Sequence, residues 1–298
     1  MTTFGVHTGL QNTTTDELLG LWKRIDELGF DWISIWDHFY AADGTGEAHC
    51  HEAIAAHTAL ACSTSRVTVG SLVYCAAYRH PAVLANATDT IDHFANGRAA
   101  VGIGGGWSQV EFDAYGIPFP GPGARLDLME EAIQCVRGLL RDETTSFQGK
   151  YFSLTDARCE PKPVRPDLPI WVGGGGEKRT LRIAAKFADA WNVPFVSPEA
   201  FAHKRDVLHR HCADVGRDPA QISCTVNVGL AWNEEDLRPQ FGNIAEFVRP
   251  GVLMGSDDQV RDHIGRYAEA GATQINIAMR APWDRDGLER LAPVLGLA

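Results

Sequence analysis

Strand-like and helix-like segments alternate along this chain from one end to the other. Each strand-like segment is a short apolar run followed by a stretch with helical periodicity, and these runs span residues 4–7, 32–36, 67–74, 98–103, 170–172, 190–193, 222–230 and 273–279. Such alternation is typical of a parallel sheet whose strands are joined by crossover helices. Eight units of this kind predict an α/β fold of the (β/α)8 TIM barrel type. An open doubly wound sheet usually has fewer strands and a different glycine fingerprint near the N-terminus.

One segment interrupts this alternation, at about residues 143–168. The stretch from Phe147 to Leu154 predicts a small β-hairpin, and the prolines between 161 and 169 indicate a surface excursion. We interpret the segment as an insertion between the fourth helix and the fifth strand. Residues 1–298 are therefore predicted to form a single barrel domain.

Capping boxes mark two of the predicted helix starts. Thr14 with Glu17, and Ser256 with Gln259, have the spacing at which a hydroxyl and a longer polar side chain satisfy each other's backbone amides. Gly29 ends the first of these helices, since glycine readily adopts the left-handed conformation that follows a helix.

Charge and composition disfavour several classes of protein. The formal net charge of −11 disfavours nucleic-acid binding, which needs a basic face. No apolar run approaches the roughly 20 residues that span a bilayer, and the N-terminus lacks a signal-peptide pattern, so a cytoplasmic protein without membrane contact is predicted. The seven cysteines form no CxxC pair and are predicted to be reduced. His49, Cys50 and His51 have no partner pair at metal-binding spacing, so no metal site is predicted.

Candidate site residues lie where strands end, because the active site of a (β/α)8 barrel is built at the carboxyl ends of its strands. Asp37 and His38 follow the second strand. An imidazole titrates near neutrality and a carboxylate can orient it, so the pair suits acid–base catalysis with His38 as the catalytic group. The alternative is a histidine bonded to a neighbouring loop.

Two glycine-rich strand ends suggest a flat ligand that backbone approaches closely. Gly173, Gly174, Gly175 and Gly176 precede a predicted helix start, where amides and the helix dipole favour a phosphate. The alternative is a flexible corner that lets strand and helix pack tightly. The run Gly104–Gly106 is followed by Trp107, which offers a stacking wall; its alternative is a tight turn. Together the two glycine runs indicate a binding site for a flavin-like cofactor.

Basic residues offer two further contacts. Lys178, Arg179 and Arg182 form a basic cluster that can face an anionic tail of the cofactor. The alternative is that these three side chains form a solvated face of the helix. Arg280 follows the eighth strand and can hold a substrate carboxylate or phosphate. Its alternative is an ion pair with Asp284 or Asp286.

Six motifs in order resemble the luciferase-like monooxygenase superfamily, and more narrowly the branch that uses coenzyme F420. They are DHF at 37–39, VGSLV at 69–73, YRHP at 78–81, GRAAVGIGGGW at 97–107, YGIPFP at 115–120 and PIWVGGGGEKRTL at 169–181. The resemblance implies a homodimer of barrels. It also implies a deazaflavin held against a bulge with a non-prolyl cis peptide bond at Leu72–Val73, and a phosphate at Gly173–Gly176.

The resemblance also implies roles for single residues. Asp37 lies by the deazaflavin, and His38 faces the substrate above the ring. Taking these together with the strand-end candidates, we predict cofactor contacts from Asp37, Leu72, Val73, Gly105, Gly106, Trp107, Gly173, Gly174, Gly175, Gly176, Lys178 and Trp191. The predicted substrate contacts are Trp107 and Arg280. Relatives often have a glutamate at the end of the fourth strand that assists proton transfer. This chain has Trp107 there and Glu111 four residues on, which leaves the proton donor open.

Three functions follow as hypotheses. The first is an F420-dependent oxidoreductase that transfers a hydride between the deazaflavin and a small organic substrate. The second is an FMN-dependent luciferase-like monooxygenase, in which the same barrel holds FMN. The third is a non-catalytic cofactor-binding barrel, against which the pair Asp37 and His38 argues.

Overall fold

The computed structural model describes residues 2–42 and 49–297. Eight of the described strands pair in parallel and close into a ring. In order around the ring they are β1 (Thr3–Thr8), β2 (Trp32–Ile35), β3 (Thr68–Ser71), β5 (Ala99–Gly104), β8 (Ile170–Gly173), β9 (Ala190–Pro194), β10 (Ser223–Ala231) and β12 (Gln274–Met279). The predicted (β/α)8 barrel is confirmed.

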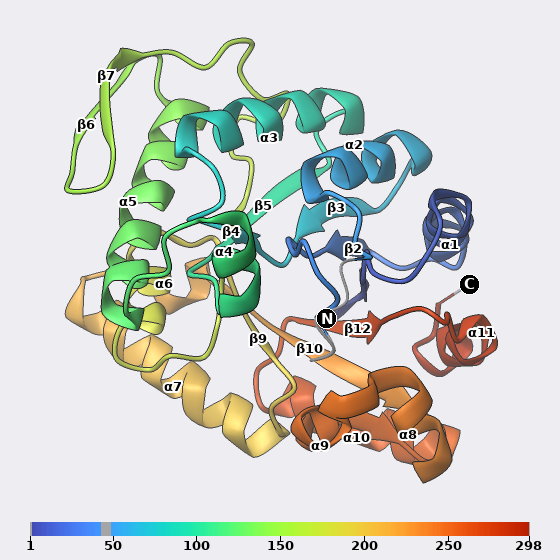
Figure 1. Ribbon diagram of the computed structural model, residues 1–298. Coiled ribbons are helices and arrows are strands. Elements are labelled where there is room, and N and C mark those ends of the chain that lie inside the picture. The colour runs from blue at the N-terminus through green and yellow to red at the C-terminus, as the bar shows by residue number, and fades with distance from the viewer. Residues whose placement is uncertain (1, 43–48, 298) are drawn as a thin grey trace.

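Helices connect successive strands and surround the barrel (Figure 1). The main ones are α1 (Thr15–Glu27), α2 (Ala53–Ser63), α3 (Pro81–Ala95), α5 (Pro122–Arg141), α6 (Thr180–Phe187), α7 (Pro198–Asp214), α10 (Asp257–Glu269) and α11 (Arg285–Val294). Both predicted capping boxes are present, at the starts of α1 and α10. In α1 the buried face is an apolar stripe of Leu18, Leu21, Trp22 and Ile25.

Two tryptophans fill the amino-terminal end of the barrel. The rings of Trp32, the first residue of β2, and Trp171 in β8 stack with centroids 4.4 Å apart. Gly70 makes room for them, since a Cβ at that position would lie 2.1 Å from the Trp32 ring. This end of the barrel is therefore packed with side chains, as is usual for (β/α)8 barrels, whose sites lie at the carboxyl ends of the strands.

The predicted insertion contains the predicted hairpin. Strands β6 (Thr145–Gln148) and β7 (Ser153–Ala157) pair antiparallel, and Figure 1 shows them standing beside α5, away from the barrel mouth. The carboxylate of Glu131 in α5 accepts hydrogen bonds from the amides of Lys150, Tyr151 and Phe152. The insertion is thus fastened to the outer helix layer.

Some elements differ from the prediction. The predicted third strand divides into β3 and β4 (Tyr74–Cys75), and α6 begins at Thr180 rather than at Glu177, which lies in a turn. The unpredicted elements are α4 (Gln109–Tyr115), η1 (Pro219–Gln221), α8 (Glu234–Phe241), η2 (Gly242–Ile244), α9 (Ala245–Val248), η3 (Arg249–Gly251) and β11 (Val252–Met254). Most are too short for periodicity to reveal. Across the described ranges, no helix is both long and apolar enough to cross a membrane.

Candidate active site

A cavity of about 650 Å³ opens at the carboxyl ends of the strands, and its wall is mostly apolar. The wall includes ten of the predicted site residues: Asp37, His38, Leu72, Val73, Gly105, Gly106, Trp107, Gly173, Gly174 and Arg280. Four others, Gly175, Gly176, Lys178 and Trp191, are not part of the described wall. The structure therefore gathers most of the candidates from five strand ends into one hollow.

His38 is held by a carboxylate from another element. Its Nδ1 lies 2.8 Å from Oε1 of Glu111 in α4, and the edge of the ring faces Trp107 at a centroid distance of 5.2 Å. The second carboxylate oxygen of Glu111 accepts a hydrogen bond of 2.6 Å from the Tyr78 hydroxyl. With Nδ1 bonded to a carboxylate, Nε2 is the ring atom left for a substrate.

The surroundings of Glu111 favour its ionised form although the side chain is buried. Burial by itself would raise the pKa of this carboxyl, but the hydrogen bond from His38, the charge of that ring and the bonds from Tyr78 and the Phe39 amide outweigh it and lower the pKa below 4.5. Burial and the bond to Glu111 raise the pKa of Tyr78, so its hydroxyl keeps donating. The pair can hold a proton on His38 Nδ1 while Nε2 gives or takes one.

Asp37 lies on the wall but is already bound on both oxygens. Arg79 donates to Oδ1 at 2.9 Å and to Oδ2 at 2.5 Å, and the amide of Cys75 donates to Oδ2 at 2.9 Å. Such a bidentate pair is among the stronger charge-assisted contacts. Asp37 therefore fastens the end of β2 to β4. Its neighbour His38, through Nε2, is the residue of this pair that is suited to proton transfer.

A bulge between β3 and β4 forms another part of the wall. The peptide bond between Leu72 and Val73 is cis, as the resemblance implied. A Cβ on Gly104 would lie 2.4 Å from Cγ2 of Val73, and a Cβ on Gly173 would lie 2.7 Å from its Cγ1. These two glycines are needed because the Val73 side chain occupies the space between β5 and β8.

The glycine corner after β8 is supported from behind. Gly174 has φ +120°, which favours glycine. Its carbonyl accepts from Trp191 Nε1 at 2.8 Å, and that of Gly175 accepts from Lys204 Nζ at 2.9 Å. Trp191 is fully buried. It therefore braces the corner from behind, and it is not among the described wall residues of the cavity.

The predicted basic cluster is only partly available. Arg179 is paired with Asp127 at 2.6 Å and donates to the carbonyl of Gly123. Lys178 is exposed in the turn before α6. Neither lines the cavity, so both lie beyond the corner rather than within the site.

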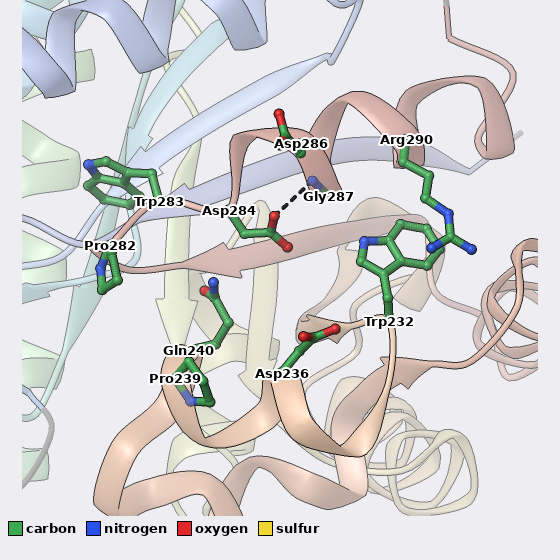
Figure 2. A pocket seen from close by; sticks show the side chains of 10 residues that line it. All are labelled: Trp232, Asp236, Pro239, Gln240, Pro282, Trp283, Asp284, Asp286, Gly287 and Arg290. Carbon is green, nitrogen blue, oxygen red and sulfur yellow. Dashed lines mark hydrogen bonds between the residues drawn. The ribbon is translucent and has the colours of Figure 1, made fainter.

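Arg280 is buried and faces the cavity, with its guanidinium 5.2 Å from the ring centre of Trp36 and 5.8 Å from that of Phe241. Asp284, one of its predicted partners, instead caps α11 by accepting from the Gly287 amide at 2.8 Å (Figure 2). The hollow drawn in Figure 2, of about 460 Å³, lies next to these residues and contains no predicted site residue.

Sequence patterns missed several wall residues, among them His7, Tyr78, Phe195, Asn227, Ile244 and Phe247. Asn192 directly follows Trp191, and successive residues of a strand point to opposite faces. Because β9 is buried on both faces along Ala190–Val193, no alternation of polarity indicated which one points inward. Among the described residues, no three His, Cys, Asp or Glu side chains lie close enough to hold a metal ion.

Two curated relatives match most of the chain. An uncharacterized protein of Mycobacterium tuberculosis is 32% identical over 218 residues, which cover 71% of this chain and 72% of that protein. An F420-dependent glucose-6-phosphate dehydrogenase of Kineococcus radiotolerans is 31% identical over 222 residues, covering 71% of this chain and 63% of the dehydrogenase.

Solved structures share the fold. An F420-dependent secondary alcohol dehydrogenase in complex with an F420–acetone adduct has a TM-score of 0.86 and 19% identity, covering 98% of both chains. The oxygenating constituent of 3,6-diketocamphane monooxygenase from Pseudomonas putida, in complex with FMN, has a TM-score of 0.77 and 16% identity, covering 99% of this chain and 97% of that one. The family model for luciferase-like monooxygenases matches residues 1–238, and the chain belongs to that family.

Proposed function

We propose that the protein is an F420-dependent oxidoreductase that transfers a hydride between the deazaflavin and a small organic substrate. The observation that carries this proposal is the pair of His38 and Glu111, 2.8 Å apart on the wall of a mostly apolar cavity. Curated relatives named as F420-dependent glucose-6-phosphate dehydrogenases support F420 as the cofactor.

The wall fits a phosphorylated flavin-like cofactor. Gly173 and Gly174 present bare backbone beside Thr180, the first residue of α6. The N-terminus of a helix carries partial positive charge and outward-pointing amides, which favour a phosphate. Val73 offers an apolar support on the same wall. These residues would hold the phosphate and the ring.

Residues of the chain provide proton transfer, orientation of the catalytic ring and exclusion of water. When bound, F420 supplies or accepts the hydride at its central ring carbon. Nε2 of His38 gives or takes the proton at the substrate oxygen, and Glu111 fixes the ring and stabilises its protonated form. Phe195, Ile244 and Phe247 line the same cavity and exclude water, which strengthens the electrostatic contacts.

FMN remains the second candidate cofactor. The corner at Gly173 and Gly174 suits the phosphate of either molecule, and a structural neighbour was solved with FMN. On this alternative the enzyme is a monooxygenase. The carboxylate-bound His38 argues against a barrel that binds a cofactor without turnover.

Separate titrations with F420 and FMN test the proposal. We expect F420 to bind in the micromolar range or tighter and FMN more weakly, as followed by fluorescence. Tight FMN binding without F420 binding would favour the monooxygenase. With a substrate in hand, His38→Ala should lower turnover by about 10²- to 10⁴-fold and leave F420 affinity nearly unchanged; unchanged turnover would remove His38 from the mechanism.

A further inference from the structure

Two buried asparagines on neighbouring strands face the cavity. Asn192 in β9 and Asn227 in β10 both line it, and each is 4% exposed. A buried amide needs partners for its carbonyl oxygen and its NH₂ group, because an unpaired one loses its hydration without compensation. What the two side chains still offer to a ligand depends on which of these groups the protein already uses.

The orientation of Asn192 follows from its neighbours. The hydroxyl of Thr225 donates to the carbonyl of Trp191 at 3.0 Å, so its oxygen accepts from Nδ2 of Asn192 at 2.9 Å. The same Nδ2 donates to Oδ1 of Asn227 at 3.0 Å. Both hydrogens of the Asn192 amide are therefore used.

The orientation of Asn227 is fixed from its other side. Gln274 Nε2 donates to Oδ1 of Asn276 at 2.7 Å, which leaves Nδ2 of Asn276 to donate to Oδ1 of Asn227 at 3.1 Å. Oδ1 of Asn227 thus accepts two hydrogen bonds. Within residues 2–42 and 49–297, Oδ1 of Asn192 and Nδ2 of Asn227 make no hydrogen bond. One acceptor and one donor therefore remain, on two hydrogen-bonded residues that line the cavity.

This arrangement is complementary to a ring edge in which an N–H lies next to a C=O. The pyrimidinedione ring of a deazaflavin or a flavin has such an edge. A ketone or an ether has only acceptors and would leave Oδ1 of Asn192 unpaired, which is unfavourable for a buried group.

We propose that Asn192 and Asn227 bind the pyrimidinedione edge of the cofactor, with Oδ1 of Asn192 accepting from the ring N3–H and Nδ2 of Asn227 donating to the adjacent carbonyl. The inference rests on the proposed function, in that a flavin-like ring enters the cavity. It holds for F420 and FMN alike, since both carry this edge. The hydrogen-bonded chain from Trp191 to Gln274 orients the two side chains before the ring binds, which reduces the entropy lost on binding.

The test uses a deazaflavin riboside and its N3-methyl derivative, with binding followed by fluorescence titration and no turnover. Methylation removes the N3–H and leaves the rest of the ring intact. For the unmodified protein we expect the methyl group to weaken binding by about 10- to 100-fold. Asn192→Ala should bring the affinity ratio of the two ligands close to one, because the acceptor is gone.

A second variant and a control separate this effect from a loss of folding. In Asn227→Asp the side chain keeps nearly the same shape, but a carboxylate oxygen replaces the NH₂ group that faces the ring carbonyl. Because two acceptors then face each other, binding of both ligands should weaken by about 10-fold or more. Thr180→Val, elsewhere on the wall, should leave the ratio unchanged. Thermal unfolding curves check that each variant is folded.

The outcomes distinguish the two proposals. Equal affinity of the unmodified protein for both rings would overturn the role of the asparagines and leave the proposed function intact. An unchanged ratio in folded Asn192→Ala would also overturn that role. Failure of the riboside, F420 and FMN to bind at all would instead contradict the proposed function.

Discussion

At the scale of the residue, the carboxylate that serves His38 comes from a helix and not from a strand end. Gly106 has φ +74°, and a Cβ there would lie 2.7 Å from Sγ of Cys75, so the chain turns sharply after β5. The turn leads into α4, which buries Glu111 against His38 and Tyr78. Trp107 lies at the cavity mouth beside the His38 ring, and its side chain is 64% exposed.

The role of Glu111 can be measured by removing its charge. Glu111→Gln keeps an acceptor for His38 Nδ1 but no longer stabilises the protonated ring, so we expect turnover to fall by roughly 10- to 100-fold, part of what a positioned acid–base group contributes. F420 affinity should change little. Tyr78→Phe removes only the hydrogen bond from the Tyr78 hydroxyl to the carboxylate. It is the matched control and should have a smaller effect on turnover. Full turnover in Glu111→Gln would contradict this role.

Two buried histidines should make stability depend on pH. Burial, together with the charges of Arg280 and His38, lowers the pKa of His7 from 6.5 to about 3, and burial lowers that of His57 to about 4. Below pH 6.5 the unfolded chain takes up protons that the folded chain does not, so the free energy of unfolding decreases as pH falls. Each ring should contribute a loss of about 2 kcal/mol between pH 6.5 and pH 5.

Urea unfolding at several pH values between 7.5 and 5 measures this loss. His7→Asn removes one of the two rings, so its stability should fall less steeply over the same range than that of the unmodified protein. Parallel pH dependences for the two proteins would show that His7 does not titrate in the way its burial indicates.

At the scale of the element, the bulge between β3 and β4 determines which neighbours can carry side chains. Val73 projects between β5 and β8, and the missing Cβ atoms of Gly104 and Gly173 provide its space. The glycine-rich strand ends therefore have a packing role as well as exposing backbone to a ligand. Gly174 differs from these two glycines. The one atom close to an added Cβ there is Cγ2 of Thr180, at 3.4 Å, so glycine is required mainly by the backbone conformation.

Gly104→Ala tests the packing of the bulge. The new Cβ would overlap Val73, and overpacking of this kind costs about 1–3 kcal/mol of unfolding free energy. Combining it with Val73→Ala should recover part of that loss, because the two side chains compete for one space. Gly265→Ala in α10, where nothing lies within 4 Å of the added atom, should instead stabilise the protein by about 0.5–1 kcal/mol. Denaturant unfolding of Gly104→Ala, Val73→Ala, their double variant and Gly265→Ala measures these effects. If the two single losses simply add in the double variant, the overlap is excluded.

At the scale of the whole molecule, one part of the helix layer lacks charge. The sequence of α2 contains no Asp, Glu, Lys or Arg, and α3 exposes Val83 and Phe94, each 57% accessible, while its two aspartates are buried. The two helices lie side by side in Figure 1. A surface with few charges and exposed apolar side chains is typical of an interface, and we propose that it pairs two copies of the chain.

Light scattering coupled to size-exclusion chromatography tests this pairing. We expect the mass of a dimer for the unmodified protein and a shift toward the monomer for Phe94→Glu, because a carboxylate buried in an apolar interface is strongly unfavourable. Phe247→Glu, which changes an equally exposed ring at the cavity, should keep the dimer mass. A monomeric unmodified protein would refute the proposal.

The sequence by itself determined the eight barrel strands, the main helices and their order, because helix caps, helical periodicity and glycine or proline breaks are local signals. It also determined that His38 lies at the end of β2, and therefore at the mouth of the barrel. Local signals could not show that Glu111, 73 residues along the chain, binds His38. That contact depends on how the turn after Gly106 packs against β4.

Only the tertiary structure decided which residues point into the cavity. The strands β2, β5 and most of β9 are buried on both faces, so their sequences show no alternation between apolar and polar residues. For this reason Trp191 and Asn192 were indistinguishable by pattern, although one braces the glycine corner and the other faces the cavity. The closure of the ring decides which face is inside, and closure arises from pairing between strands that are distant in the sequence.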